Sequence, residues 1–292
     1  MGLSAEATTD EQPAGEGRTM TGAHPIRHML LFAGAVRATP LLKAAGRNVL
    51  DLPLTADQTV GQRWLVAHRE FCEALGASPS LGVLTDRHSP KPASMPDDQA
   101  SLEPDDVAFL GTGGVLRAAA SGREGLMLVA TGGSLLTRSL PDVVERLLKL
   151  DADVAMLAEH DGTPTGIMLL SVEVLRSMPG AGYLDFKEQC LPKIAQDHRV
   201  RVAFADTDRR ACLPIRDREQ YLAAVGHACN GEPFAIVERG AEVATSARMR
   251  EAVVLRGARV GGQAVIARSV LGPSSNVGVG QVLTDRTMGG GA

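Results

Sequence analysis

Two short glycine-containing segments have the composition of ligand-binding turns. The first is AGA at residues 33–35, directly after the apolar run 28–32, and the second is GTGG at 111–114, which opens into VLRAAA. Glycine lets a backbone approach a ligand closely. In α/β sheets, ligands bind at turns that lie beyond the carboxyl ends of strands. A glycine turn can also be a simple connection, so neither segment alone identifies a ligand.

The cysteines do not have the spacing of a metal or redox site. None of them lies in a C-x-x-C pair, and a chain of 292 residues does not need disulfide bonds in order to fold. We therefore expect four reduced thiols, as is usual in a cytoplasmic protein. They are Cys72, Cys190, Cys212 and Cys229.

Alternating apolar runs and amphipathic segments are expected to hold the two turns in place. Strands that are apolar almost throughout, separated by helices, indicate an α/β layer sheet that is mostly parallel. The segment 86–106 is polar and has four prolines, so we expect a surface loop there. The patterns predict strands at 28–32, 81–85, 126–130, 153–158, 166–171 and 200–205, and helices at about 56–75, 141–150, 172–178, 185–197 and 217–229 and after the turn at 111–114.

A different period begins near residue 241. Apolar residues follow one another at steps of six or five residues, and alanine stands two positions before several of them. A helix gives a period of 3.6 and a strand a period of 2, whereas a six-residue step is one side of a triangular coil. We therefore expect a short left-handed β-helix of hexapeptide repeats, with glycines at its turns. Its inward residues would be Val243, Met249, Val254, Val260, Ile266, Leu271, Val277 and Leu283.

This coil is expected to be structural and to mediate association. Hexapeptide acyltransferases need a histidine base between coils, and no histidine follows His227. The open end of a coil exposes strand edges and apolar side chains. Such an end favours a homo-oligomer.

Composition excludes several kinds of partner. A net charge of −4 and 3% aromatic residues argue against nucleic-acid binding. No apolar run is long enough to span a membrane, and residues 1–24 lack the apolar core of a signal peptide. We expect a cytoplasmic protein with a disordered tail at 1–24, an α/β domain at 25–230, the β-helix at 236–287 and a flexible tail at 288–292.

Six segments, in order, make the chain resemble the nucleotide-sugar pyrophosphorylases, or sugar-1-phosphate nucleotidyltransferases, such as mannose-1-phosphate guanylyltransferase. They are LLFAGA (30–35), PLLKAAGRNVLDLPL (40–54), GTGGVLRAA (111–119), TGIML (165–169), KEQCLPKI (187–194) and REQYLAA (218–224). The resemblance covers roughly residues 28–287, and the GTGG segment is its most specific part. It implies a Rossmann-like, GT-A-like nucleotidyltransferase layer sheet followed by the β-helix.

The resemblance also implies a reaction and a site. In this family a sugar phosphate attacks the α-phosphorus of a nucleoside triphosphate and pyrophosphate leaves. Carboxylates hold a divalent ion such as Mg²⁺, and basic side chains with a glycine loop hold the phosphates. Carried over to this sequence, Arg37 and Lys43 would hold phosphate. The nucleotide would bind at Ala33, Gly34, Arg37, Gly111, Thr112, Gly113 and Gly114.

Four parts of the family pattern are altered in this sequence. The phosphate loop is shortened to GAVRATP (34–40), and Gly133 stands where a metal-binding aspartate is expected. Only DGTP (161–164) joins the two strands that should carry a sugar-contacting hairpin. Near the second metal position there is only Asp217, which we expect to cap a helix. Asp206, Asp208 and Glu159 could ligate a metal in principle, but we expect them on a solvated surface.

Three functions remain open. The preferred hypothesis is a non-catalytic family member that binds a nucleotide or nucleotide-sugar and regulates or scaffolds an active paralogue; it assigns no catalytic residue and no metal ligand. The alternative is an active nucleotidyltransferase, in which Arg37 and Lys43 hold phosphate and an unassigned carboxylate holds Mg²⁺. The third is a structural oligomer with a vestigial pocket, in which side chains would fill the space between residues 33–37 and 111–114.

Overall fold

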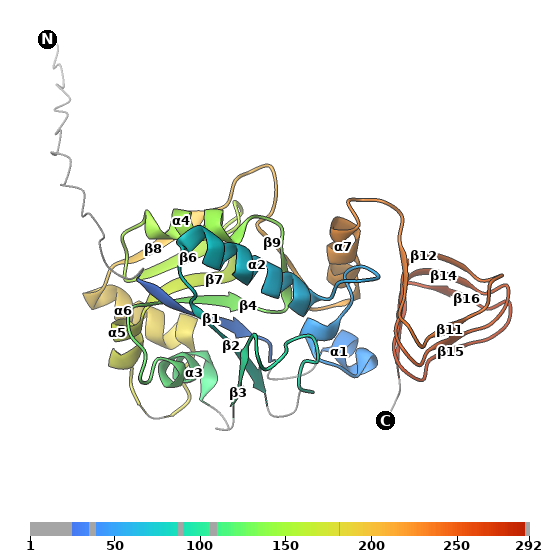
Figure 1. Cartoon of the computed structure of the whole chain (residues 1–292), viewed down its shortest axis with the longest axis horizontal. Coiled ribbons are helices and arrows are strands. Elements are labelled where there is room, and N and C mark those ends of the chain that lie inside the picture. Colours follow the sequence, from blue (N-terminus) through green and yellow to red (C-terminus); the bar gives the residue numbers. More distant parts are fainter. Residues whose placement is uncertain (1–24, 35–38, 87–89, 106–109, 181, 290–292) are drawn as a thin grey trace, which may run out of the picture.

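A seven-stranded sheet forms the centre of the structure (Figure 1). The computed structural model describes residues 25–34, 39–86, 90–105, 110–180 and 182–289. The strands lie in the order β3-β2-β1-β4-β7-β6-β8. All neighbours pair in parallel except β7, which is antiparallel to both β4 and β6, so the predicted α/β sheet, mostly parallel, is confirmed. The bounds are β1 Ile26–Phe32, β2 Ser80–Asp86, β3 Ser101–Asp105, β4 Leu126–Thr131, β6 Val154–Ala158, β7 Pro164–Ser171 and β8 Val200–Phe204.

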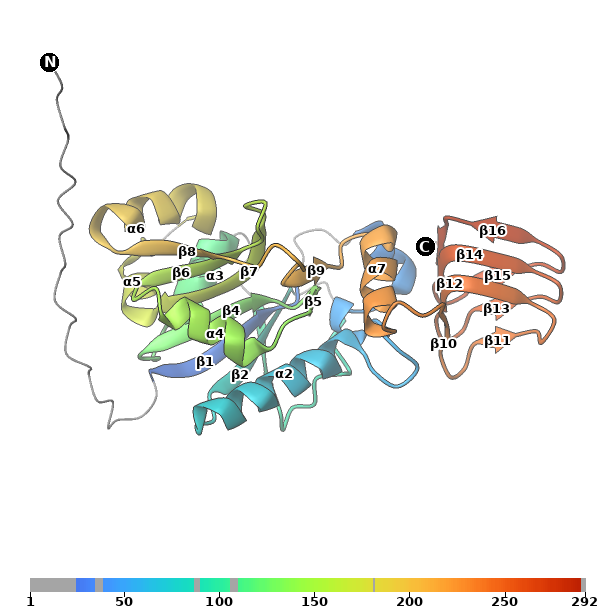
Figure 2. The ribbon, with the colours of Figure 1, turned by 90° about the horizontal axis from the view of Figure 1, so that it is seen from above.

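Helices cover both faces of this sheet (Figure 2). Helices α2 and α4 pack on the face to which Leu31 of β1 points, and α3, α5, η2 and α6 pack on the face to which Leu30 points. Neighbouring residues of β1 thus enter opposite cores, which is the two-residue period of a strand. The bounds are α2 Val60–Leu75, α3 Gly111–Ala119, α4 Leu140–Leu148, α5 Val172–Ser177, η2 Phe186–Cys190 and α6 Leu191–Asp197.

Local sequence signals set the ends of the long helix α2. The hydroxyl of Thr59 accepts a hydrogen bond from the N–H of Gln62, and the Gln62 side chain accepts one from the N–H of Thr59, at 3.2 and 2.8 Å. This reciprocal pair is a capping box, and it starts the helix at Val60 instead of near residue 56 as predicted. The helix ends at Leu75, and the following Gly76 has a φ of 60°, the left-handed conformation that glycine tolerates.

The polar segment after β2 is not only the surface loop that we predicted. Its end forms the edge strand β3, and Met95 and Ala100 are buried. The carboxylate of Asp51 accepts the N–H groups of Ala93 and Ser94, at 3.0 and 2.8 Å, and fixes the segment against the protein. We predicted a loop throughout because of the prolines, and this was wrong for the end of the segment. An edge strand tolerates a proline that a central strand would exclude.

The C-terminal part is a triangular coil that lies beside helices α1 (Pro40–Ala45) and α7 (Arg218–Ala228) (Figures 1 and 2). Arg248 pairs in parallel with Val265, and Val265 with Val282, so one turn of the coil takes 17 residues. The six-residue step is therefore shortened to five once per turn. The strands are β10 Ala235–Val237, β11 Glu242–Val243, β12 Arg248–Val254, β13 Arg259–Val260, β14 Val265–Leu271, β15 Asn276–Val277, β16 Val282–Thr284 and β17 Thr287–Met288.

The eight predicted inward residues line the inside of this coil. Six of them are buried, and Val243 and Met249 on the first turn are partly buried against the same cluster. Ala258 and Ala264, two positions before their apolar partners, are fully buried as well. Small residues are needed there because the three sides converge at the corners. The β-helix expected from the sequence is thus the architecture of this part.

The prediction that glycines form the turns of the coil holds for Gly257 and Gly280, whose φ values are 84° and 68°, but not for every corner. One corner is built by Glu251, Arg268 and Asp285, with φ values of 51°, 44° and 55°. Side chains other than glycine are strained in this left-handed region. Here the guanidinium of Arg268 donates to both carboxylate oxygens of Asp285, at 2.8 and 2.6 Å, and this contact offsets part of the strain.

The chain ends differ from the expected tails only in part. Met288, which the sequence analysis placed in the flexible tail, belongs to β17 and pairs with Leu271 of β14 on the last turn of the coil. Residues 290–292 and the expected disordered tail at 1–24 lie outside the described residues.

The coil and the α/β part are joined by a common core and a polar clamp. Val253 and Val270 of the coil belong to the same buried cluster as Tyr221 of α7. The hydroxyl of Tyr221 donates to the carbonyl of Pro53 at 2.6 Å, and its burial raises the pKa of this phenol well above the ordinary value. Arg47 and Glu238 form a two-bonded ion pair of 2.6 and 3.0 Å across the junction.

Loss of either partner of this ion pair is expected to lower the free energy of unfolding by about 2 kcal/mol, because the remaining charge is largely buried and has lost its oppositely charged partner. The side chains are only 20% and 19% exposed. The double variant Arg47→Ala/Glu238→Ala should cost clearly less than the sum of the two single variants. Urea unfolding followed by the fluorescence of Trp64, the single tryptophan of the chain, measures these differences.

A matched control is the exposed pair Glu145–Lys149 on α4, at 2.7 Å. Its double-mutant cycle should show no measurable coupling. Strict additivity at Arg47 and Glu238 would contradict the assignment of this pair as a clamp.

Candidate functional site

A large cavity lies on the sheet face that carries α3 and η2. Its volume is about 600 Å³, in the range of small-molecule sites. One end lies at the carboxyl ends of β1 and β4, where Phe32, Gly34, Thr131 and Thr112 contribute to its wall. The other end lies over β7, β6 and β8. Further lining residues are Leu116, Val129, Met156, Leu157, Ala158, Gly162, Pro164, Gly166, Ile167, Met168, Asp185, Phe186, Lys187, Leu191 and Val202.

The structure brings two of the predicted nucleotide-binding residues to this cavity. Gly34 and Thr112 both line it, although they are far apart in the sequence. Ala33 lies behind the wall, 5% exposed, where its carbonyl accepts from the Asn48 side chain at 3.2 Å. Lys43 is exposed on α1 and is not one of the lining residues. Arg37 lies outside the described residues.

The glycines of the GTGG segment form the first turn of α3 and pack against the protein. The N–H of Gly113 donates to the carbonyl of Leu184 at 2.8 Å, and a Cβ atom on Gly111 would overlap the same carbonyl. A Cβ on Gly113 would lie 2.7 Å from the sulfur of Cys190. Close packing of α3 on the 184–190 segment therefore requires glycine at both positions. Gly114 is similarly confined by Leu110.

This packing places a cation that the sequence analysis did not assign. The hydroxyl of Thr112 accepts the N–H of Phe186 at 3.0 Å, which holds Lys187 at the cavity. Within the described part of the chain the Lys187 side chain has no ion-pair or hydrogen-bond partner. The neighbouring Asp185 caps η2 and accepts the N–H of Glu188 at 2.8 Å. Lys187 opens the segment KEQCLPKI, so the family resemblance contained a signal for it.

The carboxylates considered as metal ligands are used elsewhere. Asp217 accepts the N–H of Gln220 at 2.8 Å and caps α7, as predicted. Asp206 and Asp208 pair on the surface with Arg138, and Asp206 also pairs with Arg146. In the described ranges no three His, Cys, Asp or Glu side chains come together as a metal site would require.

Glu159 is buried, contrary to our prediction that it lies on a solvated surface. Its side chain is buried, with the residue only 4% exposed, and its two carboxylate oxygens accept the N–H groups of Ala211 and Cys212 at 2.9 and 3.0 Å. These bonds hold β9 (Cys212–Pro214) beside β5 (Ser134–Leu136). Burial, with the charge of Glu159, raises the pKa of the Cys212 thiol to about 12. Cys212 therefore stays protonated and unreactive at neutral pH.

The turn that carries Gly133 is fixed by α2. The indole N–H of Trp64 is shared between the carbonyls of Gly132 and Ser134, at 3.2 and 3.1 Å. Trp64 is 2% exposed, so this bond is shielded from water.

All four cysteines are free thiols, as predicted.

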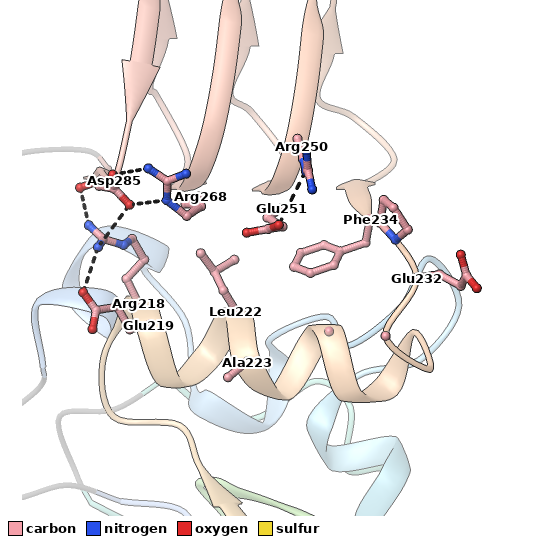
Figure 3. A pocket seen from close by; sticks show the side chains of 13 residues that line it. Arg218, Glu219, Leu222, Ala223, Glu232, Phe234, Arg250, Glu251, Arg268 and Asp285 are labelled. Atoms are coloured by element: carbon pink, nitrogen blue, oxygen red, sulfur yellow. Dashed lines mark hydrogen bonds and ion pairs between the residues drawn. The ribbon is translucent and has the colours of Figure 1, made fainter.

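A second hollow, of about 360 Å³, lies between α7 and the coil (Figure 3). Its charged groups are paired with one another: Arg218 and Arg268 contact Asp285, and Arg250 lies 3.6 Å from Glu251. Leu222 and Phe234 form the apolar part of its wall. We interpret this hollow as part of the junction, because most of its cations and acids are paired with one another; the buried Nε of Arg218 has no described hydrogen-bond partner.

Comparison with solved structures supports the fold. HddC from Yersinia pseudotuberculosis matches 69% of this chain and 99% of its own, with a TM-score of 0.50 and 16% identity. A Bacillus anthracis chain assigned as a glucose-1-phosphate thymidylyltransferase, solved with sucrose, matches 69% of this chain and 94% of its own, with a TM-score of 0.51 and 14% identity. No protein-family model and no curated protein matches the sequence. At these identities the likeness concerns the fold, which is nucleotidyltransferase-like.

None of the helices in the described ranges combines the length and the apolar character that crossing a lipid bilayer requires.

Proposed function

We propose that this protein is a divergent member of the sugar-1-phosphate nucleotidyltransferases, of the mannose-1-phosphate guanylyltransferase type, that binds a nucleotide or nucleotide-sugar without catalysis. The observation that carries the proposal is an open cavity of about 600 Å³ at Gly34 and Thr112, in a protein whose candidate metal ligands Glu159 and Asp217 have structural roles. An open cavity favours ligand binding over a vestigial pocket. Glu159 and Asp217 cannot turn to a metal without giving up the backbone groups that they bind.

The proposed nucleotide-binding set remains Ala33, Gly34, Arg37, Gly111, Thr112, Gly113 and Gly114, with Arg37 and Lys43 for phosphate. The position of Lys43 on α1, beside the coil, makes it the least direct of these. Mg²⁺ would be required only if the protein were catalytically active.

The proposed organisation is an α/β domain at 25–230 and a left-handed, hexapeptide-repeat β-helix at 236–287. In this proposal the protein is cytoplasmic and acts as a regulator or scaffold through the coil, which binds another copy or a paralogous enzyme. Val279 and Val282, on its last turn, are 78% and 67% exposed. In the described part of the chain the outer edge of β16 has no strand partner. Both features suit an association surface.

Thermal unfolding in the presence of each nucleoside triphosphate and common nucleotide-sugars, with and without Mg²⁺, tests the proposal. A ligand that binds only the folded state raises the midpoint by mass action. We expect a base-selective rise that Thr112→Val weakens by about tenfold in affinity, the scale of one hydrogen bond to a ligand. Thr284→Val, on the exposed outer side of the coil, is the matched control and should bind normally.

Two results would overturn the proposal. Release of pyrophosphate with any sugar 1-phosphate would show an active nucleotidyltransferase. Unchanged midpoints with every nucleotide would favour the structural oligomer with a vestigial pocket.

A further inference from the structure

The end of the cavity over β7, β6 and β8 is apolar. Met156, Met168 and Val202 come from these three strands, and Phe186 and Leu191 face them from the helical side. None of these side chains can donate or accept a conventional hydrogen bond. A hexose that entered this end would bury hydroxyl groups without partners, and each such group costs free energy.

This end is open because little chain covers it. β6 and β7 are joined by a tight turn in which the N–H of Glu159 donates to the carbonyl of Thr163 at 2.7 Å. The edge strand β8 leaves Val202 and Phe204 40% and 55% exposed. These two residues are two positions apart, so they lie on the same side of the strand. An apolar surface therefore continues from the cavity to the edge of the sheet.

The polar groups of the cavity are few. Thr112 already accepts a hydrogen bond from the backbone of Phe186, and Asp185 caps η2. Lys187 is the one cation among the described lining residues, and no described acid pairs with it. The cavity thus combines an apolar wall with one cation, Lys187, and one acid, Asp185, whose carboxylate accepts the N–H of Glu188. Lys187 is the charged lining group without a described partner, and it can bind the anionic group of a ligand.

We propose that the β6–β8 end of the cavity binds an apolar group, and that Lys187 binds the anionic group of the same ligand. The ligand class is a small anionic amphiphile: a phosphate or carboxylate joined to an aliphatic or aromatic body. This inference rests on the proposed function in that it assigns a substituent to the same ligand site, with the apolar body in the place of a sugar. The nucleotide would occupy the end at Gly34 and Thr112.

A matched pair of phosphate esters tests this inference on the full chain. Hexyl phosphate and glucose 1-phosphate have the same head group and the same number of carbon atoms, but only the first has an apolar body. By calorimetric titration we expect hexyl phosphate to bind at least about tenfold more tightly, because its methylene groups leave water without unpaired hydroxyls. Equal affinities, or tighter binding of glucose 1-phosphate, would overturn the proposal.

Two variants locate the binding. Lys187→Gln should weaken hexyl phosphate by about tenfold, whereas Lys193→Gln on α6, which does not line this cavity, should leave it unchanged. Val202→Asp should also weaken it, because a negative charge would enter the apolar wall; Val279→Asp, at an exposed position on the coil, should not. All four positions are exposed, so the variants should fold normally, and their unfolding midpoints check this.

The outcomes separate this inference from the proposed function. Nucleotide binding without hexyl phosphate binding would leave the proposed function standing and overturn the inference. Hexyl phosphate binding that depends on Lys187, without any nucleotide binding, would support the inference and overturn the proposed function. Binding that is insensitive to Lys187→Gln and Val202→Asp would place the ligand elsewhere and overturn the inference.

Discussion

Gly272→Ala is expected to destabilise the protein by about 3 kcal/mol, at the upper end of overpacking effects. Gly272 is buried at the junction, where the carbonyl of Ala44 at the end of α1 points between Gly272 and Gly289. A Cβ atom at position 272 would overlap the carbonyl oxygen of Ala44 and lie 2.7 Å from its carbonyl carbon. Because both contacting groups are backbone, α1 and the coil would have to move apart.

Urea unfolding measures the destabilisation, and limited proteolysis reports whether the coil is released from α1. The matched control is Gly278→Ala, also in the coil. Gly278 has no left-handed φ, and the nearest atom to a new Cβ there is the Gln281 side-chain oxygen at 3.7 Å, an ordinary contact. A midpoint for Gly272→Ala equal to that of Gly278→Ala would show that the coil does not pack on α1 as described.

Glu159→Ala is expected to lower the free energy of unfolding by about 3 kcal/mol, because it leaves two buried N–H groups without an acceptor. Those groups belong to Ala211 and Cys212, which are 2% and 4% exposed. Water cannot easily reach them in place of the carboxylate. Glu159→Gln should lower the free energy of unfolding by about half as much as Glu159→Ala. Its amide keeps one acceptor oxygen for one N–H group but presents N–H donors to the other.

Amide hydrogen exchange distinguishes this loss from a general loosening. In Glu159→Ala the amides of Ala211 and Cys212 should exchange much faster, whereas amides in the coil should keep their protection relative to global unfolding. Asp161→Asn is the control in the same turn. Asp161 pairs with Arg210 at 3.2 Å on the surface, so this change should leave the unfolding midpoint almost unaltered. Unchanged exchange at Ala211 and Cys212 in Glu159→Ala would refute the anchoring role of Glu159.

Several features were predictable because their causes lie within a few residues of sequence. The capping role of Asp217 depends on the residue three positions later, and the order of strands and helices depends on local periodicity. The coil was predictable because each side repeats the same inward apolar residue. Its stacking at 17 residues then follows from steps of six, six and five.

The cavity could be predicted only in part. The places of Gly34 and Thr112 at the cavity were predicted from the glycine segments and the family resemblance. The glycines on either side of Thr112, however, also allow α3 to pack against Leu184, which the sequence did not indicate. Lys187 was in a recognised segment, yet nothing in that segment says that Thr112 holds it at the cavity. The apolar wall comes from Met156, Met168 and Val202, which only the antiparallel placement of β7 and the pairing of β6 with β8 bring together.

The sequence by itself determined the α/β class, the triangular coil and the cap of α7, because periodicity and capping act over short stretches of chain. Only the tertiary structure decided which groups are engaged and which are free. Glu159 is a buried anchor because β9 presents two N–H groups to it, and the carbonyl of Ala44 requires glycine at 272 because α1 packs on the coil. These contacts join residues that are 52 or more positions apart in the sequence. They could not be predicted from the sequence, because burial and hydrogen-bond partners are set by packing between distant segments.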